Sequence, residues 1–200
     1  WYAGFADVQG SPELAEDMHV LIGNYLVELG QFEAAKQHLL PALADQEERL
    51  GRDHWKTMYT LMTIAKMQLD QGNLREADDL SAEVEQWVRQ GGDPWGPIAM
   101  ELMAHRLDIL EALSRWLECV ELGEELLDRM DDVQFNKINN GFTQEEVDLR
   151  IKGVVGRNLL YSSQIQMDPE TRQEMFDWSH AVLAKVIAEG TELEDIGPRH

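Results

Sequence analysis

The sequence predicts an all-α protein in which antiparallel helix hairpins stack one after another, the architecture called an α-solenoid. Three observations lead to this prediction. Apolar residues recur with helical spacing along most of the 200 residues. A glycine-centred pattern returns at a fixed distance along the chain, and clusters of turn-forming residues separate the periodic segments. Repetition at this length is typical of stacked helix pairs, each of which covers the apolar face of its neighbour.

The glycine-centred pattern occurs at Gly30 and again at Gly72, a separation of 72 − 30 = 42 positions. The other matched pairs at this offset are Ile22 and Ile64, Gly23 and Ala65, Phe32 and Leu74, and Ala35 and Ala77. A glycine after a helix supplies the left-handed conformation that ends it, and the small residue lets two helices approach closely. A third copy follows, in which Ser114, Trp116 and Cys119 take the places of the glycine, the large residue and the small residue.

The small-and-large pattern of the first copy resembles the signature of a tetratricopeptide repeat, and its positions are Gly23, Gly30, Phe32, Ala35 and Ala42. The 42-residue period is similar to the subtype found in kinesin light chains and many bacterial signalling proteins. Their linker usually reads Leu-Gly-x-Asp-His-Pro-x-Thr; here Leu50 to His54 match it, Trp55 replaces the proline, and Thr57 is retained. The resemblance implies a right-handed superhelix.

The pattern predicts five segments along the chain. They are an N-terminal capping segment or helix remnant at 1–10, three hairpins at 11–130, a connecting loop at 131–143, a divergent fourth hairpin at 144–190 and a loose tail at 191–200. Gly190 is expected to end the last helix. Gly153 and Gly156 lie inside the fourth hairpin and suggest that its helices pack closely, with local fraying as the alternative.

The charge balance limits the classes of partner. The chain has 38 acidic and 17 basic residues, which gives a net charge of −21. A field of this sign repels nucleic acids and anionic membranes and attracts a basic peptide or protein. The competing interpretation is that the acidic residues only keep a long helical surface soluble. Cys119 is the only cysteine, which excludes an internal disulfide and agrees with an expected cytoplasmic location.

Catalysis and metal binding are not indicated. The six histidines are scattered, and none forms a His-x-x-x-His pair. Cys119 is expected to be an inert packing residue, and we find no phosphate-binding glycine loop. His105 and Asp108 share a helical face, where a surface hydrogen bond is a simpler interpretation than a catalytic pair. We therefore expect no catalytic residues, no metal, no cofactor and no enzyme activity.

The resemblance implies a concave face, lined by the first helix of each hairpin, that binds peptides. The residues that it places there are Asn24, Tyr59, Met62, Thr63, Lys66, His105 and Asp108, with Asp17, Val20 and Glu101 beside them. Tyr59 and Met62 are the expected apolar anchors; the alternative is that both pack against the neighbouring hairpin. Only Asn24 and Lys66 remain of the cationic clamp with which chaperone-binding relatives hold a carboxylate, so an acidic tail is not the expected ligand.

These observations predict a scaffold or regulatory arm that binds a protein or peptide with basic and apolar character. The alternative is a sensor for a small ligand or signal peptide, coupled to an effector domain outside this chain. A helical enzyme with an unrecognised site is a third and weaker hypothesis. An exposed apolar groove on the inner face would favour the first function, and a closed, deep pocket with converging polar groups would favour the second.

Overall fold

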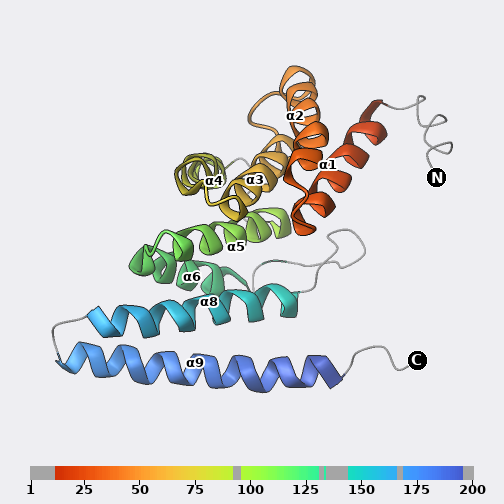
Figure 1. The fold of residues 1–200 in the computed structure, drawn as a ribbon. Helices are drawn as coiled ribbons and strands as arrows, with labels where there is room; N and C mark the ends of the chain where they lie inside the picture. The colour runs from red at the N-terminus through yellow and green to blue at the C-terminus, as the bar shows by residue number, and fades with distance from the viewer. Residues whose placement is uncertain (1–11, 92–95, 131–132, 134–143, 166–168, 196–200) are drawn as a thin grey trace. The chain divides into compact units, whose positions relative to one another are not determined.

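The computed structural model describes residues 12–91, 96–130, 133, 144–165 and 169–195, and within these residues it is helical, without strands (Figure 1). The helices are α1 (Pro12–Glu28), α2 (Phe32–Arg49), α3 (Trp55–Asp70), α4 (Leu74–Arg89), α5 (Pro97–Ala112), α6 (Trp116–Met130), α8 (Gln144–Ile165) and α9 (Pro169–Asp195). Each helix packs mainly against its neighbours in the chain. None of the helices in the described residues is both long and apolar enough to cross a membrane.

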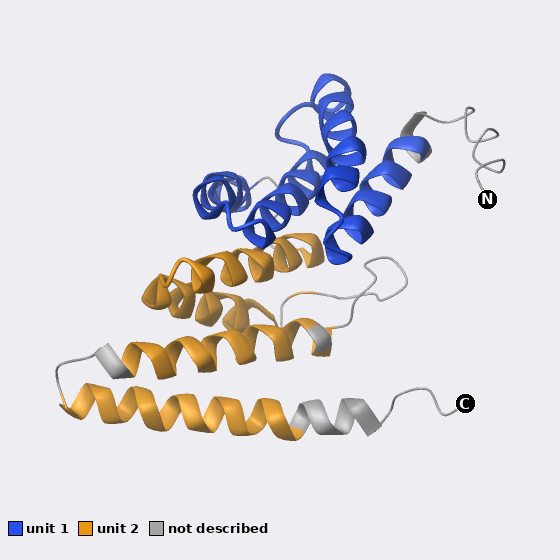
Figure 2. Cartoon of the chain, in the orientation of Figure 1, with its two compact units in different colours: residues 1–92 blue, residues 93–200 orange. Residues whose placement is uncertain are grey.

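The chain divides into two compact units, residues 1–92 and 93–200 (Figure 2). In the first unit, α1 pairs with α2, α3 pairs with α4, and α2 packs against α3. The core that joins these two hairpins is made by Val27, Ala35, Leu39, Ile64 and Met67. Side chains of both hairpins contribute to this core, so the second hairpin covers apolar surface that the first hairpin would otherwise expose to water.

The predicted 42-residue repeat is confirmed in the backbone of the first unit. Gly30 and Gly72 have positive φ angles of 68° and 78°, the left-handed conformation that ends a helix at low cost for glycine. The hydrogen bonds around them also match: the amide of Gln31 donates to the Leu26 carbonyl at 2.8 Å, and that of Asn73 to the Gln68 carbonyl at 2.8 Å. The α1–α2 and α3–α4 turns therefore have the same geometry, residue by residue.

The second unit contains the hairpins α5–α6 and α8–α9, with α8 packed on both α5 and α6. Close helix crossings occur where glycine removes the side chain. A Cβ atom added to Gly123 would lie 2.1 Å from Val155 Cγ2, and one added to Gly156 would lie 2.8 Å from Leu183 Cδ2. The close packing predicted for Gly156 is confirmed, whereas Gly153 makes only ordinary contacts, with the nearest atom at 3.6 Å.

The prediction that Gly190 ends the last helix is wrong, because α9 continues to Asp195. A glycine inside a helix costs only about 1 kcal/mol relative to alanine, which is too little to stop a long helix by itself. Residues 191–195, predicted as part of a tail, are therefore helical. The predicted N-terminal segment 1–10, all but residue 133 of the loop at 131–143, and residues 196–200 lie outside the described residues.

Ser114 occupies the turn position that glycine holds in the first two repeats, and its φ is 58°. A residue with a side chain in this conformation is destabilised by roughly 1–2 kcal/mol. Glycine avoids this cost, but part of the gain is offset because glycine makes the unfolded chain more flexible. We expect Ser114→Gly to raise the free energy of unfolding by roughly 0.5–1 kcal/mol. Denaturant unfolding followed by circular dichroism measures this, and a destabilised variant would contradict it.

The glycine crossings in the second unit allow a matched comparison. We expect Gly123→Ala to lower the free energy of unfolding by about 1–3 kcal/mol, because its methyl group would overlap the stiff, buried Val155. Gly153→Ala, with open contacts, should instead be neutral or stabilising by up to about 1 kcal/mol. In thermal and denaturant unfolding, Gly123→Ala should therefore be less stable than the wild type and Gly153→Ala should not be, and equal shifts would refute the crossing argument.

Candidate functional site

The inner face predicted for α3 is only partly accessible. Tyr59 and Lys66 are half-buried, but Met62 is 1% exposed and Thr63 is 4% exposed, with its hydroxyl donating to the Tyr59 carbonyl at 3.0 Å. The prediction that Met62 is an accessible anchor is wrong. Met62 continues the helical spacing of Met58 and precedes Ala65 on the same face, and all three are buried in the core. The burial of Met62 agrees with the alternative interpretation, in which it packs against neighbouring helices.

Two ion pairs hold α1 beside α3. Lys56 Nζ lies 2.6 Å from Asp17 Oδ1, and Lys66 Nζ lies 3.1 Å from Glu28 Oε1. Asn24, half-buried, lies on the same strip of α1 as the two acidic residues, one or two helical turns from each. Because Glu28 already neutralises Lys66, this lysine is a poor clamp for the carboxylate of a ligand. A carboxylate ligand would have to compete with Glu28 for Lys66.

In the second unit, His105 and Asp108 of α5 are brought together with Arg150 of α8. Arg150 contacts His105 Nδ1 at 2.6 Å and forms an ion pair with the Asp108 carboxylate. Seven residues further along α8, Arg157 pairs with Glu111 at 2.9 Å. Sequence analysis missed both arginines. Their spacing places them on one face of the helix. Their partners lie more than 40 positions away in the sequence, so no pattern of neighbouring residues indicates that these ion pairs form.

The neighbours of Asp108 determine its charge state. Burial by itself would raise the pKa of the Asp108 carboxyl, but the hydrogen bond with His105 and the charge of Arg150 outweigh it. The pKa therefore lies below its ordinary value, and the carboxylate stays ionised at neutral pH. With each charge paired inside the protein, the cluster joins α5 to α8.

Cys119 is buried, and its thiol lies 3.5 Å from the Leu107 carbonyl. Burial, reinforced by the negative charges of Glu111 and Asp108, raises the pKa of the thiol to about 12. A thiol in this state is not a nucleophile at neutral pH. Among the described residues, no group of three histidine, cysteine or acidic side chains is placed to hold a metal ion.

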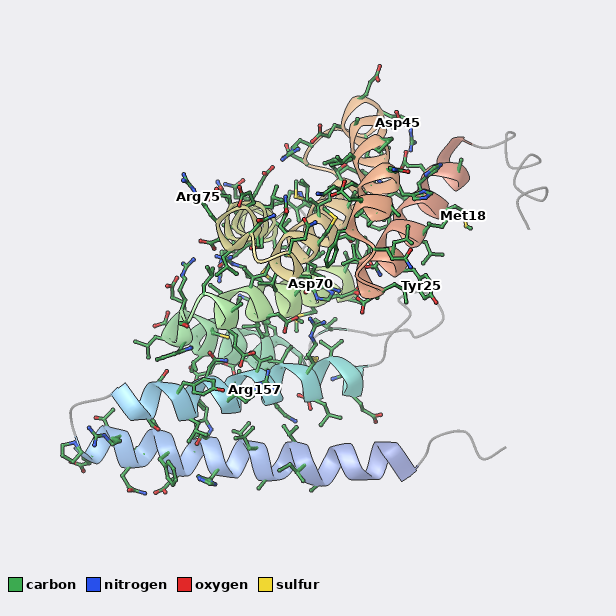
Figure 3. All side chains as sticks on the ribbon, viewed as in Figure 1. Met18, Tyr25, Asp45, Asp70, Arg75 and Arg157 are labelled. Atoms are coloured by element: carbon green, nitrogen blue, oxygen red, sulfur yellow. The ribbon has the colours of Figure 1, made fainter. Side chains whose placement is uncertain are left out.

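Apolar side chains that are partly or mostly exposed follow one face of α1 and continue just past its end, and we call them the α1 stripe: Met18, Leu21, Tyr25 and Leu29. Leu21 is 61% exposed and Tyr25 64% exposed, one helical turn apart. Figure 3 shows Met18 and Tyr25 on the side of α1 that is turned away from α2 and α3. Sequence analysis missed this stripe, although its spacing of three and four residues repeats along a second face of the helix.

No protein-family model matches the sequence, and no curated protein matches it either. Among solved structures, the chain is similar to the crystal structure of the nearly identical TPR-like repeats of a putative kinesin light chain from Podospora anserina. The similarity covers 83% of this chain and 75% of that chain, with a TM-score of 0.53 and 18% sequence identity. This chain has a tetratricopeptide-like fold. At this identity the likeness establishes the fold, and the kinesin-light-chain subtype stays a prediction.

The paired state of Asp108 predicts a pH dependence. Its folded-state pKa is lowered, so its contribution to stability is present above the unfolded pKa of about 3.9 and is lost as the pH falls through the folded-state pKa. We expect Asp108→Asn to destabilise the protein at neutral pH and to differ less from the wild type below about pH 4. Urea unfolding at both pH values measures the difference.

Asp45→Asn is the control for that experiment, because it removes one negative charge from an exposed position on α2. Its effect on the free energy of unfolding should be small at neutral pH. An Asp108→Asn variant that behaves like this control at neutral pH would show that the ion pair with Arg150 does not stabilise the second unit.

Proposed function

We propose that this chain is a protein-interaction module that binds a partner of basic and apolar character at the α1 stripe. The observation that carries the proposal is the exposure of Leu21 and Tyr25, two large apolar side chains on adjacent turns of one helix. Tetratricopeptide-like folds are interaction scaffolds, which agrees with this role. Exposed apolar residues that are contiguous, rather than scattered, indicate a contact surface.

Two side chains of this size are enough to anchor a partner. Complete burial of a large apolar side chain contributes about 1.5–3 kcal/mol. Tyrosine is also among the residues that most often dominate the binding energy of an interface. Leu21 and Tyr25 are mostly exposed, so a partner that covers them would gain the favourable free energy of removing their apolar surface from water.

Charge favours a basic partner. The chain has a net charge of −21, which raises the rate of encounter with a positively charged protein. The strip formed by Asn24, Tyr59 and Lys66, which are partly exposed residues of the predicted inner face in the first unit, is proposed as a polar flank of the site. Met62 and Thr63 are excluded from it by their burial.

The alternative function, a small-ligand sensor, requires polar groups that point into a common pocket and can bond to the ligand. The polar cluster that the second unit assembles around Arg150 is instead held together by its own ion pairs. The proposal therefore includes no catalytic step and no cofactor. A cytoplasmic location is part of it and agrees with a single, buried thiol at Cys119.

Peptide selection tests the proposal. A random peptide library displayed on phage is selected on the full chain, and the enriched peptides are synthesised. We expect them to be rich in lysine, arginine and large apolar residues. Their affinity should fall about tenfold or more for the double variant Leu21→Ala, Tyr25→Ala, because both anchors are removed.

Leu40→Ala is the matched control, since Leu40 is an exposed leucine on α2, outside the stripe. This variant should bind the selected peptides as the wild type does. Thermal unfolding should show that neither change affects folding, because exposed side chains contribute little to stability. Enrichment of acidic peptides, or equal affinity of the double variant and the wild type, would disprove the proposed site.

A further inference from the structure

The repeat allows the α1 stripe to be compared with the same positions on α3. At the offset of 42, Tyr25 corresponds to Met67 (67 − 25 = 42), and Leu21 corresponds to Thr63 (63 − 21 = 42). Tyr25 is 64% exposed and Met67 1% exposed; Leu21 is 61% exposed and Thr63 4% exposed. The matching turns at Gly30 and Gly72 show that the comparison is one of equivalent backbone positions. The same helical face is thus covered on α3 and open on α1.

The preceding hairpin provides the cover on α3. Met67 belongs to a core cluster with Ile64 of its own helix, and the other members come from the hairpin before it: Val27, Ala35 and Leu39, with Leu43 packed against them. Three of these side chains belong to α2, which packs against α3. The occupant of this helical face within the protein is therefore an α-helix.

The covering helix has a recognisable pattern. Ala35, Leu39 and Leu43 are spaced at four-residue intervals along α2 and so share one face, with a small residue first and two leucines after it. The small residue permits close approach. Leu39 lies against Gly23 of α1 and belongs to the core cluster with Met67, so this face of α2 contributes to a core that α1, α2 and α3 share. A helix with this pattern fits the equivalent face of α1, where the stripe is open.

We infer that the partner presents an amphipathic α-helix, which docks on the α1 stripe as α2 docks on α3 and so adds one helix to the stack. This inference rests on the proposed function and specifies its partner. The docked face carries a small residue followed by two large apolar residues at four-residue spacing. The opposite face is basic, because the acceptor chain has a net charge of −21. The same charge on both copies opposes self-association through this face.

The probe is a synthetic peptide with the sequence of residues 31–50, changed only on the side that is exposed in α2. The changes are Glu33→Lys, Asp45→Lys and Glu48→Lys, to make that side basic, and Pro41→Ala, to raise the helix propensity of the isolated peptide. We expect fluorescence anisotropy to show binding to the full chain. Affinity should fall about tenfold or more for the double variant Leu21→Ala, Tyr25→Ala and stay unchanged for Leu40→Ala.

Two altered peptides test the binding mode. A version with Leu39→Asp and Leu43→Asp lacks the anchors and should not bind. A version with Leu40→Pro retains the three face residues but has a lower helix propensity, because proline removes one backbone hydrogen bond of the helix, so it should bind more weakly than the parent peptide. Circular dichroism should show that the parent peptide gains helicity when it is mixed with the chain.

The outcomes separate this inference from the proposed function. If the phage-selected peptides require Leu21 and Tyr25 but tolerate proline at each position, the partner is extended, and the helix inference is overturned while the proposed function stands. If neither the selected peptides nor the helical probe responds to the double variant, both are overturned.

Two other occupants are tested directly. Sedimentation that shows a dimer in the wild type, but not in the double variant, would assign the stripe to a second copy of the chain. If a chain without residues 1–11 binds the probe more tightly than the full chain, the stripe is covered by the N-terminal segment of the same chain. Either result would overturn the inference of a partner helix.

Discussion

The approach of neighbouring helices at positions without a bulky side chain is the constraint on which the fold depends. An added Cβ would be 2.5 Å from Leu39 at Gly23 and 2.1 Å from Val155 at Gly123. These contacts bring helix axes near enough for apolar side chains to interlock over their whole length. The buried small residues Ala35, Ala77 and Cys119 serve the same purpose at the start of α2, α4 and α6.

Within the first unit, the first helix of a hairpin packs one face against its own partner helix, and another face is free to be covered by the hairpin that precedes it. On α3 that face is filled by α2, and the residues there are buried. On α1 it is open in the described residues, and Leu21 and Tyr25 remain in contact with water. The exposure of the α1 stripe thus follows from the packing rule that builds the rest of the unit: no helix among the described residues covers this face of α1.

The sequence predicted the fold well because its repeat depends on local chemistry. Glycines that require a positive φ and small residues at crossings are visible one position at a time, and both Gly30 and Gly72 have the expected geometry. The binding face was predicted less well. Whether Met62 or Leu21 is exposed depends on which neighbouring helix covers it, and this is a property of tertiary packing. Arg150 could not be recognised for the same reason, since its partners His105 and Asp108 belong to another hairpin.

The burial of Cys119 has a practical consequence. It is the only thiol in the chain, it lies in the second unit, and its pKa of about 12 keeps it protonated. Alkylating reagents attack the thiolate, so modification of the native protein requires the hairpin around Cys119 to open first. The rate of alkylation therefore measures local unfolding of the second unit alone. Compared with global unfolding, this rate shows whether the two units unfold together or one after the other.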